Sequence, residues 1–347
     1  MLGPERKSYS PPMLYGIGIG GPMQLIGPVA KMVEDAGFES CWAAETTNTA
    51  FVTAAAAVAA TDRIQVGTAI ALAFPRSPTI TAMTAWDLDE LSGGRFILGL
   101  GSQVKRVNEN RFSVPFEHPA PKLKEYVQVL RTVWAANRGE RVVHEGRFYR
   151  VTMPTFHGAP QPDRRDVPIY LAAVGPVMAR ACGEVADGLI GHPIASPRYL
   201  RQVVRPAIDE GAERRGRKPD DVNLTASPMV SLADDVDLAR REVKLQIAFY
   251  ATTRTYRAIL ETHGRAGIQG DLRAAFDARD HDAMIALIDD ELCDAIAVAG
   301  RPEEAVERLR EWDGVADRLM LGGPWYGVPQ ERLVENYRAL VEIFGGL

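Results

Sequence analysis

Cysteine is scarce in this sequence. There are three in 347 residues, and Cys41, Cys182 and Cys293 lie far apart in the chain. Such separation excludes both a local metal-binding spacing and a disulfide framework. We therefore expect each cysteine to be a small, buried apolar residue in a protein of the reducing cytoplasm.

Long hydrophobic runs and a large excess of one charge are also absent. No run of about 18 apolar residues predicts a membrane span, and residues 1–7 lack the hydrophobic segment of a signal peptide. The formal net charge of −5 gives no general attraction for nucleic acid or anionic lipid. We expect the partner to be a small molecule, and neither a nucleic acid nor a membrane.

The apolar pattern alternates between strand-like and helix-like segments along the chain. Eight short strands are expected at residues 14–20, 39–44, 64–71, 96–101, 167–172, 188–192, 222–230 and 318–321. Helices are expected at 24–37, 51–60, 79–91, 122–137, 199–215, 302–312 and 330–344, with a broken helical stretch at 234–292. A small hairpin is expected at 141–152, after an irregular loop at 112–121.

Eight strands alternating with helices predict an α/β fold of the (β/α)8 barrel type. We expect one domain over residues 1–347, with insertions at about 105–165 and 234–300. A doubly wound sheet is the alternative. Gly16, Gly18, Gly20 and Gly21 lack the spacing of its dinucleotide-binding fingerprint, which favours the barrel.

One strand runs directly into a glycine, a proline and a helix, at residues 169–180. Gly175 lets the backbone approach a ligand, and Pro176 suits the first helical position, where its missing N–H costs nothing. The N–H groups that follow have no partner within the helix and lie at its positive end. This pattern predicts an anion site for a phosphate, although an ordinary strand-to-helix loop has the same pattern.

The predicted carboxyl ends of the strands, where such barrels carry their active sites, are poor in reactive groups. Many residues there are small, and Glu45 and His192 are the main ionisable ones. The sequence shows no Ser-His-Asp set, no metal-binding cluster and no closely spaced pair of carboxylates. A roomy site with few reactive groups of its own indicates an imported cofactor that carries a phosphate and a ring.

Three segments resemble the luciferase-like flavin and deazaflavin oxidoreductases. They are RIQVGTAIA at 63–71, LSGGRFILGLGS at 91–102, and PIYLAAVGP at 168–176 followed by ADG at 186–188. Their order and spacing are similar to those of the family, and the likeness covers nearly the whole chain. GHP at 191–193 and FYATT at 249–253 look like the branch that uses coenzyme F420.

The resemblance implies a cofactor site of defined residues. Ala69 and Ile70 would be joined by a cis peptide bond and would form an apolar bed for the ring. Gly101, Ser102 and Gln103 would border the sugar-like chain, with Gly18 at the end of the first strand. The phosphate would be held at Ala173, Val174, Gly175, Pro176 and Val177. The implied chemistry is hydride transfer between the deazaflavin and a small organic substrate.

The residue that handles the proton is not fixed by the resemblance. Relatives with His after the acidic residue of the second strand differ from this chain, which has Thr46 there, and Val104 stands where others have Glu. Glu45, His192 and Glu109 remain the candidates. Glu45 could instead anchor a loop or an arginine, and His192 could cap the loop that follows it.

Aromatic residues are expected to wall the substrate pocket. Phe249 and Tyr250 lie in the long insertion, and Trp325 and Tyr326 follow the last strand. Simple core packing is the alternative role for all four. Few charges lie near them, so we expect a neutral or weakly polar substrate.

Two other functions remain open. The same fold could use FMN and oxygen as a monooxygenase, or it could bind a flavin-like molecule without catalysis. The resemblance also implies a homodimer.

Overall fold

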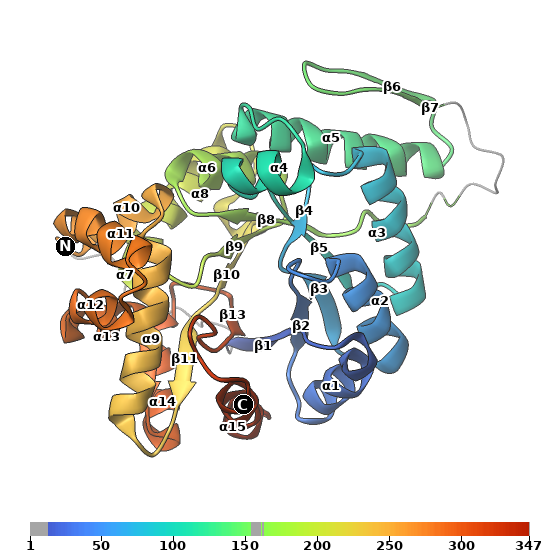
Figure 1. Cartoon of the computed structure of the whole chain (residues 1–347). Coiled ribbons are helices and arrows are strands. Elements are labelled where there is room, and N and C mark those ends of the chain that lie inside the picture. The colour runs from blue at the N-terminus through green and yellow to red at the C-terminus, as the bar shows by residue number, and fades with distance from the viewer. Residues whose placement is uncertain (1–12, 154–160, 162, 347) are drawn as a thin grey trace, which may run out of the picture.

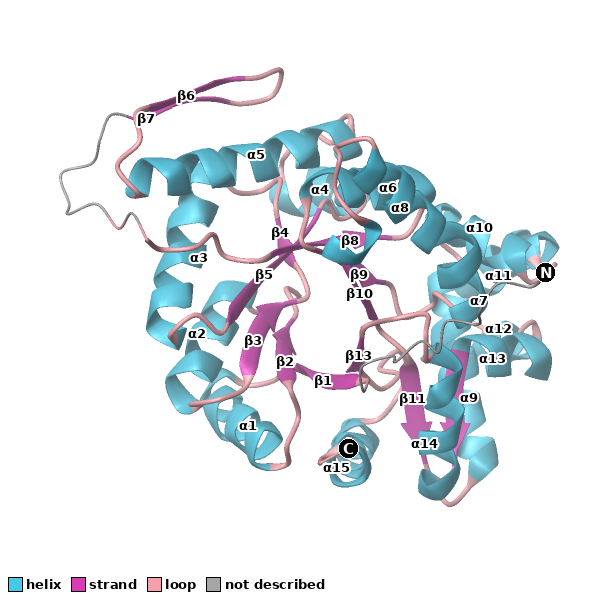
Figure 2. Ribbon diagram, turned by 180° about the vertical axis from the view of Figure 1, so that it is seen from behind, coloured by secondary structure: helices cyan, strands magenta, loops and turns pink. Residues whose placement is uncertain are grey.

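The chain forms a closed barrel of parallel strands surrounded by helices (Figures 1 and 2). The computed structural model describes residues 13–153, 161 and 163–346. Around the ring the strands are β1 (Leu14–Ile19), β2 (Ser40–Ala43), β3 (Gln65–Thr68), β5 (Phe96–Gly101), β8 (Ile169–Ala173), β9 (Gly188–Gly191), β10 (Asn223–Ala226) and β13 (Arg318–Leu321). Because β13 pairs with β1 and β3 pairs with β5, the ring is complete, and the predicted barrel is confirmed.

The other strands lie outside this ring. They are β4 (Ala71–Leu72), which pairs with β5; β6 (Val142–Glu145) and β7 (Arg150–Met153), the predicted hairpin; and β11 (Met229–Leu232) and β12 (Ala297–Gly300). The β6–β7 hairpin stands away from the barrel in both views (Figures 1 and 2).

The helices match the expected alternation. They are α1 (Met23–Asp35), α2 (Ala50–Ala60), α3 (Pro78–Ser92), α4 (Lys105–Phe112), α5 (Pro119–Asn137), α6 (Pro176–Val185), α7 (Pro197–Tyr199), α8 (Arg205–Glu213), α9 (Val236–Ala251), α10 (Arg257–Thr262), α11 (Gln269–Asp277), α12 (His281–Ala286), α13 (Asp290–Ile296), α14 (Pro302–Leu309) and α15 (Gln330–Phe344). Short 3-10 turns are η2 (Pro219–Asp221), η3 (Arg254–Tyr256), η4 (Ala266–Ile268) and η5 (Arg310–Trp312), and a π turn, η1 (Leu200–Val204), joins α7 to α8.

The prediction of one strand over 222–230 was wrong. The segment divides into β10, which stays in the barrel, and β11, which leaves it to pair with β12. Pro228 lies between them and has no N–H for a strand ladder, so the break falls there. The expected strand 64–71 also divides, into β3 and β4. The expectations for residues 1–7, and part of the loop after the hairpin, lie outside the described residues.

Buried aromatic side chains fill the inside of the barrel. Trp42 and Tyr170 pack together with Ile97 and Ile190 in one interior cluster. Glycines on the neighbouring strands make this possible: a Cβ at Gly67 would lie 2.4 Å from the ring of Trp42, and one at Gly188 would lie 2.6 Å from the ring of Tyr170. Glycine at these positions is therefore a packing requirement of the barrel interior.

The amino-terminal end of the barrel is closed by an arginine. Arg318, the first residue of β13, is 4% exposed and donates to Glu39 at 2.8 Å and to Gln65 at 2.9 Å. Its guanidinium lies 5.5 Å from the ring of Trp42 and 6.0 Å from that of Tyr170. A planar, delocalised cation can stack on aromatic faces while bonding at its edge, which suits this position.

All three cysteines are buried, as predicted. No helix in the described part of the chain is long and apolar enough to cross a bilayer.

Helices α6 and α8 cross at a pair of glycines. A Cβ on Gly183 of α6 would lie 2.1 Å from the carbonyl oxygen of Ile208, and one on Gly211 of α8 would lie 2.1 Å from that of Arg180. The two backbones are therefore in close contact, and this contact fixes the position of α6, which follows β8 directly.

We predict that Gly183→Ala lowers the free energy of unfolding by about 1–3 kcal/mol, because the added methyl group forces the two helices apart. The control is Gly270→Ala in α11, where nothing lies within 4 Å of the new methyl group. It should be neutral or slightly stabilising, since alanine favours a helix over glycine. Urea denaturation followed by circular dichroism measures both, and equal midpoints for all three proteins would contradict the prediction.

Candidate functional site

The carboxyl ends of the ring strands form one rim, and the predicted cofactor residues lie along it. The peptide bond between Ala69 and Ile70 is cis, as the resemblance implied. Both side chains are half-buried and pack on the interior cluster around Trp42 and Tyr170. They therefore form an apolar surface that rests on the filled part of the barrel.

Glycine on β5 makes room for this surface. A Cβ on Gly101 would lie 2.1 Å from Cδ1 of Ile70, so a larger residue would displace the Ile70 side chain. Two residues before Gly101 on the same strand, Gly99 pairs with Thr68. Thr68 Oγ1 donates to the carbonyl of Gly99 at 2.7 Å and accepts from the Gly99 N–H at 2.9 Å. This paired contact joins the end of β3 to β5 where the chain leaves the regular ladder.

The first turn of α6 is open to a ligand. Gly175 is the N-cap residue, no side chain caps the helix, and nothing lies within 4 Å of a Cβ built on Gly175. The first helical bond runs from the Ala179 N–H to the Gly175 carbonyl at 3.1 Å. The N–H groups of Val177 and Met178 thus have no partner within the helix, which makes this terminus suitable for an anion.

A hydrogen bond from α7 fixes the loop before α6. Tyr199, a buried residue of α7, donates its phenol hydrogen to the Val174 carbonyl at 3.0 Å. The N–H of Tyr199 in turn donates to Ser196 Oγ at 3.1 Å. Ala173, the last residue of β8, is buried. The inner side of the loop is therefore packed against the protein, while its outer side, at the start of α6, is open.

Ser102 and Gln103 form a tight turn after β5. Gln103 has φ +56°, in the left-handed region, and its side-chain oxygen accepts the Val104 N–H at 2.9 Å. Asn108 of α4 is fully buried and donates to the carbonyls of Ser102 at 2.8 Å and Val104 at 3.1 Å. The turn is therefore shaped by α4. Gly18, on β1, is half-buried at the same rim.

Glu45 binds two neighbours. One carboxylate oxygen accepts the Leu72 N–H at 2.7 Å and the Arg76 guanidinium at 2.8 Å, and the other oxygen also accepts from Arg76. The side chain is 6% exposed. This arrangement fixes β4, directly after the cis bond, and favours the anchoring alternative over proton transfer.

Glu109 lies away from these groups. It is on the exposed side of α4, and its nearest charged partner is Lys105, at 3.8 Å. Nothing in its surroundings holds it toward the rim.

His192 follows β9 and lies in an aromatic environment. Its Nε2 is 2.9 Å from the phenol oxygen of Tyr256, and its Nδ1 is 3.3 Å from the N–H of Ile194. Its ring centre is 4.4 Å from that of Tyr256 and 4.6 Å from that of Tyr250. Burial lowers the pKa of His192 to about 3, so the imidazole is neutral near pH 7.

The four predicted wall residues come together. Phe249 stacks on Tyr326 with ring centres 4.2 Å apart and meets Trp325 edge-on at 5.4 Å. Trp325 Nε1 lies 3.3 Å from the phenol oxygen of Tyr250. The chain after β13 is therefore packed against α9. This grouping is compatible with a substrate wall, and it also contributes to the core.

Sequence reasoning missed the residue that makes this grouping. Gln246 of α9 is almost fully buried, and its side-chain oxygen accepts the N–H groups of Trp325 at 2.9 Å and Tyr326 at 2.8 Å. Tyr199, Tyr256, Arg76 and Asn108 were missed as well. Except for Asn108, which bonds to Ser102 and Val104 nearby, each acts through a residue distant in sequence, and no local motif marks such a contact. Tyr256, three residues beyond the FYATT segment, was the nearest to a recognisable signal.

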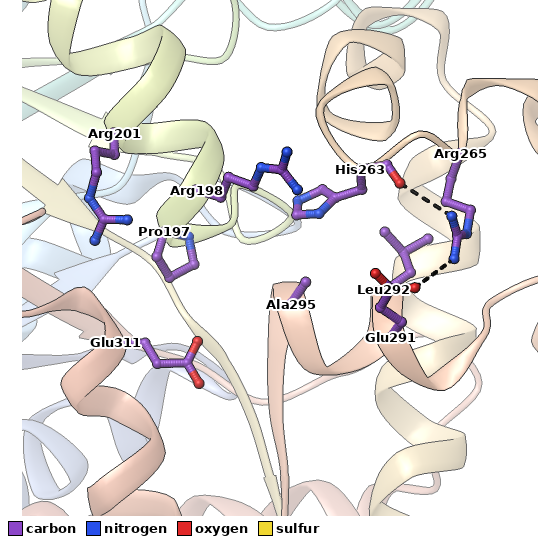
Figure 3. A pocket seen from close by; sticks show the side chains of 9 residues that line it. All are labelled: Pro197, Arg198, Arg201, His263, Arg265, Glu291, Leu292, Ala295 and Glu311. Atoms are coloured by element: carbon purple, nitrogen blue, oxygen red, sulfur yellow. Dashed lines mark hydrogen bonds and ion pairs between the residues drawn. The ribbon is translucent and has the colours of Figure 1, made fainter.

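A separate pocket of about 410 Å³ lies between α7 and α13 (Figure 3). It is lined by Pro197, Arg198, Arg201, His263, Arg265, Glu291, Leu292, Ala295 and Glu311. Arg265 is already paired with Asp289 at 2.7 Å and Glu291 at 2.9 Å, and Glu311 adds a further negative charge. The mixed charges give no clear preference for a ligand.

Comparison with known proteins gives consistent matches over most of the chain. The family described as luciferase-like monooxygenase matches residues 16–318. An uncharacterized protein of Mycobacterium tuberculosis is 40% identical over 297 residues, which are 84% of this chain and 87% of that protein. A 5,10-methylenetetrahydromethanopterin reductase of Methanolobus tindarius is 28% identical over 319 residues, 90% of this chain and 94% of that enzyme.

The solved structure of the coenzyme F420 dependent tetrahydromethanopterin reductase from Methanopyrus kandleri has the same architecture. It superposes with a TM-score of 0.79 at 25% identity, covering 96% of this chain and 97% of that chain.

We predict that Glu45 and Arg76 are coupled in stability. In a double-mutant cycle of Glu45→Gln and Arg76→Met, the coupling energy should be about 1–3 kcal/mol, because the pair is largely shielded from water. The matched control is the exposed pair Glu145 and Arg150 of the hairpin, where coupling should be close to zero. Urea denaturation measures both cycles, and equal coupling in the two pairs would show that the Glu45–Arg76 pair does not contribute to this anchor.

Proposed function

This chain belongs to the luciferase-like monooxygenase family, and on that basis we propose that it is an oxidoreductase dependent on coenzyme F420. The match of nearly the whole chain to the F420 dependent reductase from Methanopyrus kandleri supports this coenzyme. The observation that carries the proposal is the open start of α6 on the same rim as the apolar surface of Ala69 and Ile70.

The residues at the rim fit a ring with a phosphate-bearing tail. Ala69 and Ile70 would support the ring, and the free N–H groups at Val177 and Met178 would bind the phosphate. The turn at Ser102 and Gln103 lies between them, because β5 separates β3 from β8 in the ring. The space beside Gly175 allows a ligand to approach the backbone closely.

The coenzyme, when bound, would supply a hydride acceptor or donor at its ring. The protein would bind the phosphate, keep the ring on an apolar bed and hold a substrate beside the aromatic residues. We propose a neutral or weakly polar substrate, because the grouped side chains there are Phe249, Tyr250, Trp325 and Tyr326. Glu45 would act as a positioning residue for the bed.

The experiment that tests this function is a pair of titrations on the purified protein. We expect saturable quenching of F420 fluorescence and no saturable binding of FMN. Tight FMN binding without F420 binding would replace the proposal with the alternative of an FMN-dependent monooxygenase. F420 binding without turnover of alcohols, aldehydes, sugar phosphates or enones would favour a protein that only binds the coenzyme.

We predict that Gly175→Asp weakens F420 binding tenfold or more, which corresponds to about 1.4 kcal/mol. A carboxylate beside the start of α6 would repel the phosphate. Gly175→Asn is the matched control: its side chain has nearly the same size and shape but no charge, so it should lose less affinity than the aspartate variant. Fluorescence titration gives both dissociation constants. If the aspartate variant bound F420 as tightly as the unmodified protein, the phosphate would not bind at the start of α6.

We also propose a homodimer through the outer faces of α2 and α3. Val52 of α2 is 56% exposed, and Ile80 and Met83 of α3 are 57% and 45% exposed. The two helices lie side by side (Figure 1), and these exposed side chains give their outer faces an apolar character.

We predict that the double variant Ile80→Lys, Met83→Lys is a monomer, since lysine cannot be buried there without a partner. Light scattering after size exclusion measures the mass, and Val334→Lys on α15 is the control, which should remain a dimer. A dimeric double variant would place the interface elsewhere.

A further inference from the structure

We propose that the phenol of Tyr256, fixed by His192, donates a hydrogen bond to the oxygen of the substrate, which is therefore a neutral carbonyl compound or alcohol. This inference rests on the proposed function. It assigns a catalytic role to Tyr256 and a positioning role to His192.

The first step is the tautomer of His192. Its Nδ1 faces the backbone N–H of Ile194 at 3.3 Å, and an N–H group can only donate. Nδ1 must therefore be the acceptor nitrogen, and in the neutral ring the hydrogen lies on Nε2. Nε2 is 2.9 Å from the phenol oxygen of Tyr256, so it donates to that oxygen.

The second step is the state of the imidazole. The titratable groups that contact its ring are the phenols of Tyr250, from α9, and Tyr256, from η3. Neither phenol carries a charge near pH 7, because burial raises the pKa of both above its usual value. With its own pKa lowered by burial, the imidazole stays neutral, and Nε2 keeps its hydrogen.

The third step is the hydrogen of the Tyr256 phenol. Its oxygen accepts from His192, and the described residues offer the phenol hydrogen no acceptor. The neighbouring phenol of Tyr250 likewise accepts, from Trp325 Nε1 at 3.3 Å. Its contact is longer than the 2.9 Å between Tyr256 and His192, so Tyr256 is the more firmly positioned donor of the two. A half-buried O–H donor without an acceptor is costly, and a ligand oxygen would satisfy it.

The fourth step is location. His192 follows β9, the neighbour of β8, and β8 leads directly into the open start of α6. Tyr256 follows α9, which carries Phe249 and Tyr250. The phenol therefore lies beside the aromatic grouping, at the rim where the coenzyme is proposed to bind. A neutral donor in this position recognises an uncharged oxygen acceptor.

The first test uses the protein alone. In 15N-labelled protein, the His192 resonances are identified by their loss in His192→Gln. We expect the tautomer with hydrogen on Nε2, unchanged from about pH 5 to about pH 8. Tyr256→Phe should shift the Nε2 resonance, because the acceptor is removed. Hydrogen on Nδ1, or no response to Tyr256→Phe, would overturn the inference regardless of any cofactor.

The second test uses the protein with reduced F420 and a panel of neutral ketones, aldehydes and enones, such as cyclohexanone and 2-cyclohexen-1-one. We expect Tyr256→Phe to lower kcat about 100-fold, in the range for loss of a hydrogen-bond donor to the oxygen on which charge develops, with the dissociation constant of F420 unchanged. Tyr337→Phe removes a phenol of α15 that has no hydrogen-bond partner among the described residues; it is the control and should leave kcat unchanged.

The role of His192 is tested by two variants. His192→Leu should lower kcat by a factor similar to Tyr256→Phe, and His192→Gln should recover part of it, because its amide keeps a donor near the position of Nε2. Full activity of Tyr256→Phe, or F420-dependent turnover of other substrates with no reduction of any neutral carbonyl, would overturn this inference alone. Failure of F420 to bind would instead overturn the proposed function.

Discussion

The structure depends on how the inside of the barrel is filled. Trp42 and Tyr170 occupy the interior, and glycines at positions 67 and 188 on adjacent strands provide the space that these rings need. Arg318 lies across the amino-terminal end and contacts both rings. The interior is thus packed from the amino-terminal end of the barrel toward the carboxyl-end rim. At the rim, these packed side chains support the apolar surface that we assign to the coenzyme. A change in ring size at either position would alter the height of that surface.

The alternation of strands and helices was sufficient to predict the ring, because most of its strands are short apolar runs that lead into a helix. It was insufficient where a segment lacks that pattern. Helix α4 has a single buried residue, Asn108, so no apolar stripe marks it. Strand β12 is four residues long and directly follows a helix, and β11 continues the apolar run of β10, so neither could be distinguished before the structure was known.

In the candidate site, too, some features could be predicted from adjacent residues and others could not. The glycine and proline before α6 are adjacent in sequence, so the open helix terminus could be predicted from local rules. The contacts of Gln246 with the chain at Trp325 and of His192 with Tyr256 join residues 79 and 64 positions apart. Contacts between residues so far apart cannot be predicted from local patterns in a single sequence. Sequence reasoning named Glu45, His192 and Glu109 as candidate proton carriers by residue type and gave Glu45 and His192 a structural alternative; the neighbours of Glu45 and His192 favour positioning roles for both.

The closure of one barrel end by Arg318 limits where a ligand can bind. Trp42 and Tyr170 fill the interior above it, so a ligand can reach this barrel only at the opposite rim. A ring that lay on Ala69 and Ile70 would have one face covered by the protein and the other face open. A second molecule would then lie on the open face, and it could be exchanged while the ring stayed bound.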